Sequence, residues 1–80
     1  MSTLYQLNSI FQEVFDDPQL QVRADTSSAD VRDWDSVAQV KLVLAIEEAF
    51  EIRLSSDELS SIHTVGDFLT AIARQRGLPQ

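Results

Sequence analysis

The chain has 80 residues, 13 of them acidic and 6 basic, and its formal net charge is −7 at pH 7. This length allows one small domain, and we expect residues 1–80 to form it. The negative charge excludes nucleic-acid binding and favours partners with basic surfaces. The chain has no cysteine, so a disulfide or a thiolate metal site is excluded. It also shows no signal pattern or membrane-spanning apolar run, so we expect a cytoplasmic monomer without membrane insertion.

The first expected helix covers residues 4–15. Thr3 and Gln6 have the spacing of a capping box at its start. Apolar residues then recur at helical intervals: Leu4, Leu7, Ile10, Phe11, Val14 and Phe15. Two aspartates and Pro18 end the helix, because proline disfavours helix in the residue before it. Tyr5 lies on this helix, and we expect its ring to pack at the edge of the core.

Residues 19–33 show no sustained periodicity, and we expect them to form a long loop. The stretch 25–30 is rich in Asp, Ser and Thr, whose side chains bind nearby backbone and favour turns. Three apolar residues should hold this loop against the core: Leu20, Val22 and Val31. Trp34 follows the loop, and we expect it to act as a structural plug that packs its ring against this loop and fixes the direction of Ser36.

A second helix is expected within residues 33–51, which contain no Gly or Pro and are rich in Leu, Ala and Glu. Asp35 and Ser36 both suit its N-terminus. One face of the helical wheel gathers a core stripe: Leu42, Val43, Ile46, Ala49 and Phe50. The opposite face gathers charged residues: Lys41, Glu47, Glu48 and Glu51. Val37 and Leu44 lie inside this charged face, which is either ordinary exposure or a docking surface with apolar anchors.

Two further helices are expected after the second one. Ser55 and Glu58 have capping-box spacing before a short helix at about residues 57–61. Leu59 and Ile62 should point inward from this region. The fold class is therefore all-α: a small bundle of three main helices plus one short helix, with a long loop between the first and second helices.

Thr64 and Asp67 mark the start of the last helix as N-cap and third helical residue. Its apolar face consists of Val65, Phe68, Leu69 and Ile72. Two basic residues near its end, Arg74 and Arg76, complement the helix dipole, and residues 77–79 should stop it.

Groups that could perform catalysis are few in this chain. Ser36 lacks a Gly-x-Ser-x-Gly elbow, and the single histidine, His63, falls in an expected loop, so we assign no catalytic residue. The acidic residues lack the spacing of a calcium loop, and we expect no metal site. Taken alone, Ser36 would be interpreted as a helix N-cap.

A family resemblance rests on Asp35-Ser36-Val37, followed by Val40, Leu42, Ala45-Ile46-Glu47-Glu48 and Phe50. This pattern, with the length and helix order of the chain, resembles the acyl carrier protein family over nearly the whole sequence. The resemblance implies that Ser36 carries 4'-phosphopantetheine, taken from coenzyme A, through a phosphodiester, and that Asp35 belongs to the attachment motif. It also implies a carrier that has no catalytic activity and is a substrate of a phosphopantetheinyl transferase.

The same resemblance implies partners that handle acyl thioesters: acyl-activating, condensing or acyl-transfer enzymes with basic docking surfaces. We expect Val37 and Leu44 to be apolar anchors for them. The charged partners on this face would be Glu47, Glu48 and Glu51, which pair with Arg or Lys. Lys41 stands where the family usually has an acid, so it is our candidate for selecting between pathways.

Two further departures from the family pattern are Val37 in place of Leu and Trp34 in place of a small Gly-containing turn. The Trp-Asp-Ser form is similar to free-standing carriers of dedicated lipid, polyketide or secondary-metabolite pathways. Two alternatives stay open. One is an aminoacyl or aryl carrier of the peptidyl type, although that type tends to have Gly-Ser. The other is an unmodified acidic helical interaction domain in which Ser36 is only a cap.

Overall fold

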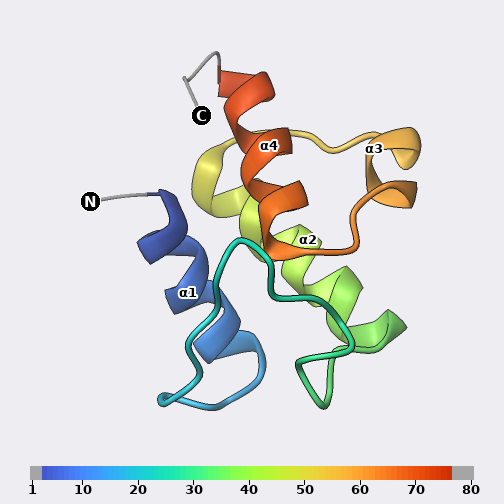
Figure 1. The fold of residues 1–80 in the computed structure, drawn as a ribbon. Coiled ribbons are helices and arrows are strands. Elements are labelled where there is room, and N and C mark those ends of the chain that lie inside the picture. The colour runs from blue at the N-terminus through green and yellow to red at the C-terminus, as the bar shows by residue number, and fades with distance from the viewer. Residues whose placement is uncertain (1–2, 77–80) are drawn as a thin grey trace.

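The computed structural model describes residues 3–76, and in this range the chain forms a small helical bundle (Figure 1). Its helices are α1 (Thr3–Val14), α2 (Ser36–Phe50), α3 (Ser56–Ser60) and α4 (Val65–Arg76). The prediction of three main helices, one short helix and a long loop after the first is confirmed. The expected stop at residues 77–79 lies outside the described residues. None of the described helices is long and apolar enough to cross a membrane.

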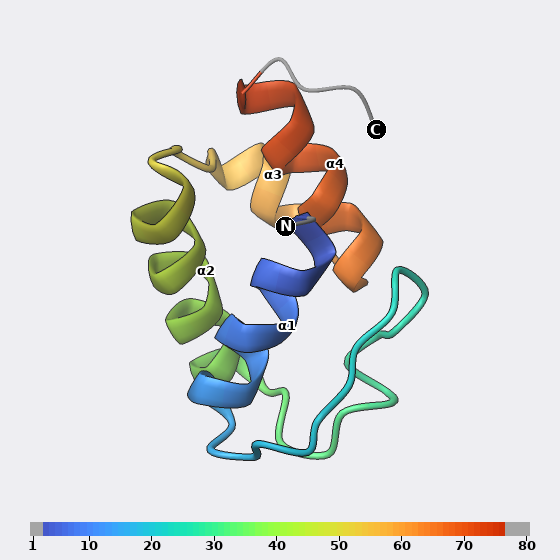
Figure 2. The same ribbon diagram turned by 90° about the vertical axis from the view of Figure 1, so that its left-hand side faces the viewer.

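The core lies between α1, α2 and α4, and Figure 2 shows α1 and α2 side by side. The most deeply buried side chains come from these three helices: Leu7, Phe11, Leu42, Ile46, Val65, Phe68 and Ile72. Two predictions about this core are wrong. Ala49 is exposed, because the buried stripe of α2 advances in steps of four residues and leaves Ala49 about 100° from Phe50. Tyr5 is 61% exposed, which is more than expected for a ring packed at the edge of the core.

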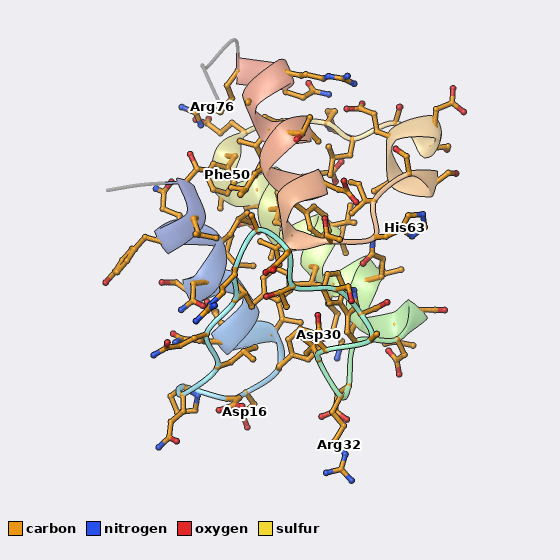
Figure 3. The ribbon with its side chains drawn as sticks, in the orientation of Figure 1. Asp16, Asp30, Arg32, Phe50, His63 and Arg76 are labelled. Atoms are coloured by element: carbon orange, nitrogen blue, oxygen red, sulfur yellow. The ribbon has the colours of Figure 1, made fainter. Side chains whose placement is uncertain are left out.

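Side chains hold several helix ends, although the capping box expected for Thr3 and Gln6 is not observed, since Thr3 lies within α1. The capping box of α3 is confirmed, since Ser55 Oγ accepts from the Glu58 N–H (3.2 Å) and Glu58 Oε1 accepts from the Ser55 N–H (3.1 Å). The end of α4 is tied to α2, where Arg76 Nη1 donates to the Phe50 carbonyl at 3.0 Å (Figure 3). This bond satisfies a carbonyl in the last turn of α2, which has no partner within the helix.

The start of α4 is capped as predicted. Thr64 Oγ1 accepts from the Asp67 N–H at 3.1 Å, and Asp67 Oδ2 accepts from the His63 and Thr64 N–H groups at 2.8 and 3.0 Å. The hydrogen bond from the His63 backbone, together with those from Thr64, holds the pKa of the Asp67 carboxyl below its ordinary value. The short side chain of Asp67 therefore replaces the usual Glu of a capping box.

The long loop between α1 and α2 is fastened to the bundle at several points. Val22 and Val31 are buried and Leu20 is half-buried against the core, which confirms the prediction for these three residues. Two backbone hydrogen bonds then join the loop to the first turn of α4: Val65 N–H to the Thr26 carbonyl (2.8 Å) and Gly66 N–H to the Ala24 carbonyl (2.7 Å). The loop is thus positioned by α4 as well as by its own turns.

Gly66→Ala should destabilise the fold, because a Cβ at Gly66 would lie 2.8 Å from the Ala24 carbonyl oxygen, which is backbone. We expect the free energy of unfolding to fall by about 1–3 kcal/mol, the usual cost of overpacking. Urea denaturation measures this change. Alanine normally favours a helix over glycine, so an unchanged or higher urea midpoint would contradict the close contact.

Trp34 anchors the segment that leads into α2. Its indole is 8% exposed, meets Phe11 edge to face at 5.2 Å between centroids, and stacks over Phe68 at 6.4 Å. The indole is therefore buried like the expected plug, but it packs on rings from α1 and α4, which the sequence analysis did not predict. Because Trp34 precedes the Asp-Ser motif by one residue, the head of α2 is held against the core.

Candidate functional site

The N-terminus of α2 is capped by Asp35 and not by Ser36. Asp35 has an extended backbone (φ −109°, ψ −168°), and its Oδ1 accepts from the Ala38 N–H at 2.9 Å. Ser36 is the first residue of the helix, so its interpretation as an N-cap is wrong. Its side chain is exposed, and its hydroxyl makes no hydrogen bond within residues 3–76. Because Asp35 supplies the N-cap, the Ser36 hydroxyl is not used to cap the helix.

Two backbone donors are also available beside this hydroxyl. The Ser36 and Val37 N–H groups have no acceptor in the described part of the chain, whereas the Ala38 and Gln39 N–H groups bond to Asp35. Unpaired N–H groups at the positive end of a helix dipole favour an anion. The Asp35 carboxylate opposes that preference electrostatically, so its contribution here is to hold the first turn of α2.

A surface hollow of about 370 Å³ opens next to Ser36, between the first turn of α2 and the segment that follows α3. Its lining is partly apolar and partly polar: Trp34, Leu59, Ile62, Ser28, Asp35, Ser36, Gln39 and His63. Figure 3 shows His63 on the α3 side of this region, in the loop where the sequence predicts it. The hollow therefore leaves open space beside the Ser36 side chain.

The side chains that line the hollow include one imidazole, that of His63. His63 is exposed, and its backbone N–H bonds to Asp67. Within residues 3–76, no group of three or more His, Cys, Asp or Glu side chains could hold a metal ion.

An exposed apolar stripe continues from Ser36 along α2. Val37 and Leu44 are 63% and 61% exposed, as the helical wheel indicates. The sequence analysis names Val40 only as part of the family pattern. It is 58% exposed, and its spacing of three and four residues from Val37 and Leu44 places it on the same face as these anchors. We call this surface the α2 stripe, and it consists of Val37, Val40, Lys41, Leu44 and Glu48.

The acidic residues of α2 differ in how free their carboxylates are. Glu48 and Glu51 are exposed and have no hydrogen-bonded side-chain oxygen within the described residues. Glu47 is half-buried, and its Oε2 accepts from the Leu54 N–H at 2.9 Å. Glu47 therefore holds the segment after α2 in place, and this leaves Glu48 and Glu51 as the more accessible acids.

Comparisons with known proteins agree with this geometry. The family model described as the phosphopantetheine attachment site matches residues 6–72. The acyl carrier protein of Acidothermus cellulolyticus is 39% identical over 67 residues, which are 84% of this chain and 80% of that protein. The acyl carrier protein of Picosynechococcus sp. is 38% identical over 77 residues, covering 82% of this chain and 95% of that protein.

The fold has a solved counterpart. The solution NMR structure of holo acyl carrier protein from Geobacter metallireducens matches with a TM-score of 0.88 and 31% identity, over 96% of this chain and 88% of that one. The helices and the motif thus define a small helical carrier of acyl groups. The chain belongs to the acyl carrier protein family, whose covalent cofactor is 4'-phosphopantetheine. Members of this family carry acyl groups and do not catalyse reactions.

Proposed function

We propose that Ser36 is the residue to which 4'-phosphopantetheine is attached, and that a separate phosphopantetheinyl transferase uses this chain as its substrate. The observation that carries the proposal is the exposed Ser36 hydroxyl, which is left unbonded because Asp35 caps α2. The hollow of about 370 Å³ beside it gives room for the group. No base on this chain needs to activate the hydroxyl, since the transferase would supply that base.

The residues around Ser36 suit a phosphodiester. The free N–H groups of Ser36 and Val37 can donate to its oxygens, and the dipole of α2 favours its negative charge. Asp35 keeps the first turn of α2 in place through the Ala38 N–H. When bound, the group supplies a thiol for holding acyl groups as thioesters, which this cysteine-free chain lacks.

The α2 stripe would be the docking surface for partner enzymes. Its aliphatic side chains can enter apolar pockets, while Glu48 of the stripe and Glu51 at the end of α2 can pair with Arg or Lys of the partner. Exposed ion pairs contribute only about 0.2–1 kcal/mol each, so docking would be transient and salt-sensitive. A tethered acyl group would then reach several enzymes at high local concentration. The pathway we propose is a dedicated lipid, polyketide or secondary-metabolite pathway.

Lys41 should help to select those partners, because it places a positive charge in the middle of the α2 stripe and makes no ion pair within residues 3–76. We expect Lys41→Glu to improve use by enzymes with basic docking surfaces about 1.4- to 5-fold in kcat/KM, the equivalent of one exposed ion pair. The gain should shrink as salt is added. The prediction is wrong if every partner enzyme uses both forms equally.

The attachment itself is tested by incubating the protein with coenzyme A and a promiscuous phosphopantetheinyl transferase and then measuring its intact mass. We expect a gain of one phosphopantetheine in the natural chain and none in Ser36→Ala. Ser28→Ala is the matched control, since Ser28 is another exposed serine lining the same hollow, and it should be modified normally. Absence of the gain with several transferases would favour an unmodified interaction domain.

A further inference from the structure

The orientation of one side-chain amide beside Ser36 is fixed by its neighbour. Trp34 Nε1 lies 2.6 Å from Gln39 Oε1, and an indole N–H can only donate. The amide oxygen of Gln39 must therefore face the indole, and its nitrogen Nε2 must face the other way. Because the Trp34 ring is buried between Phe11 and Phe68, this orientation is held by the core.

The nitrogen of Gln39 has two N–H donors and no acceptor within residues 3–76. It belongs to a half-buried side chain that lines the hollow beside Ser36. The other half-buried glutamine within residues 3–76 shows the contrast: Gln12 Nε2 donates to the Pro18 and Leu20 carbonyls at 3.0 and 2.9 Å. Unused donors therefore lie at the hollow.

Gln39 also lies on the correct side of α2 to meet a group attached to Ser36. The two residues are three positions apart, and residues at this spacing are neighbours on one helix face. The pantetheine arm contains two amides, and each presents a carbonyl acceptor. A half-buried amide with free donors and a flexible chain with carbonyl acceptors are chemically complementary.

We propose that Gln39 is a positioning residue for the arm, with its Nε2 donating a hydrogen bond to an amide carbonyl of pantetheine and seating the arm in the hollow. This inference rests on the proposed attachment at Ser36. One such bond should favour the seated arm over the free arm roughly 2- to 13-fold, from the usual net strength of a hydrogen bond. Partner enzymes would then have to break this hydrogen bond when they withdraw the arm from the hollow.

The test compares nitrogen-15-labelled protein before and after attachment by NMR. In the modified protein, the Gln39 side-chain amide signals and the Trp34 indole N–H signal should shift, and the Gln39 amide protons should show nuclear Overhauser effects to the arm. The Gln12 and Gln75 amide signals should not move, since their donors are already bonded. These two residues are internal controls.

Two variants separate the donor from the rest of the side chain. Gln39→Glu keeps an oxygen for the Trp34 indole but has no donor, and Gln39→Met is neutral and also has no donor. Both should be modified at Ser36, and in both the Trp34 indole N–H signal should no longer shift on attachment. The inference is overturned if the natural chain gains the full mass while the Gln39 signals stay unchanged, or if attachment shifts the Trp34 indole signal as much in Gln39→Met as in the natural chain. A missing mass gain would instead overturn the proposed attachment, and this inference with it.

Discussion

Phe68→Ala should lower the free energy of unfolding by about 3–5 kcal/mol, the usual cost of removing a buried aromatic side chain. Phe68 is fully buried on α4, with its ring 6.3 Å from that of Phe11 and 6.4 Å from that of Trp34. The substitution leaves a cavity between α1, α4 and the segment before Ser36. Since small domains are stable by only about 5–15 kcal/mol, a large part of the total would be lost. Urea denaturation, monitored by circular dichroism, measures this change in the free energy of unfolding.

Leu69→Ala is the matched control for Phe68→Ala. Leu69 lies next to it on α4 but is only half-buried, so we expect roughly half the loss or less. Among the molecules that remain folded, both variants should still be modified at Ser36, because neither residue touches the hydroxyl. Equal losses in the two variants would contradict the placement of Phe68 at the centre of the core.

Leu44→Ala should reduce kcat/KM for modification by a phosphopantetheinyl transferase about 30-fold, the equivalent of about 2 kcal/mol for a central apolar anchor. Leu44 is 61% exposed in the middle of the α2 stripe, so removing its side chain deletes contact area for a partner and little packing. The free energy of unfolding should change by no more than about 0.5 kcal/mol. Steady-state kinetics of the transferase, with the concentration of each carrier form varied, gives kcat/KM for Leu44→Ala and for the natural chain.

Tyr5→Ala provides the comparison, because Tyr5 has the same exposed fraction as Leu44 but lies on α1. It should leave kcat/KM for the transferase unchanged. If Leu44→Ala and Val37→Ala both behave like Tyr5→Ala, the α2 stripe is not the docking surface. Loss of activity in all three variants would indicate a general effect of exposed apolar area and would also contradict the assignment.

The helices could be predicted from the sequence because their signals are local. Apolar residues recur at helical spacing in α1 and α4, and the caps of α3 and α4 use neighbouring residues such as Ser55 with Glu58. The plug role of Trp34 was also predictable from its place before the motif. The helical wheel wrongly placed Ala49 in the core. The buried residues of α2 wind gradually around the helix, whereas the wheel assumes one fixed apolar face.

The site was less predictable, since it depends on contacts between distant segments. Asp35 and Ser36 are adjacent and both residue types form N-caps, so the sequence does not decide between them. The backbone angles of Asp35 in the structure do. The hollow brings together Ser28, Ser36, Ile62 and residues from elsewhere in the chain, which only the tertiary fold makes neighbours. The hydrogen bond from the Leu54 N–H to Glu47 was not predictable either, because it depends on the path of the chain after α2.

The most direct test of the central claim is fragmentation mass spectrometry of the protein purified from its own host. Cleavage after Arg32 and Lys41 by trypsin releases a peptide of residues 33–41 in which Ser36 is the only hydroxyl residue, so the fragment series identifies the modified position. We predict a 4'-phosphopantetheine, free or acylated, on Ser36 and on no other serine. An unmodified Ser36 in protein purified from growing cells, or the same group found on another residue, would contradict the account.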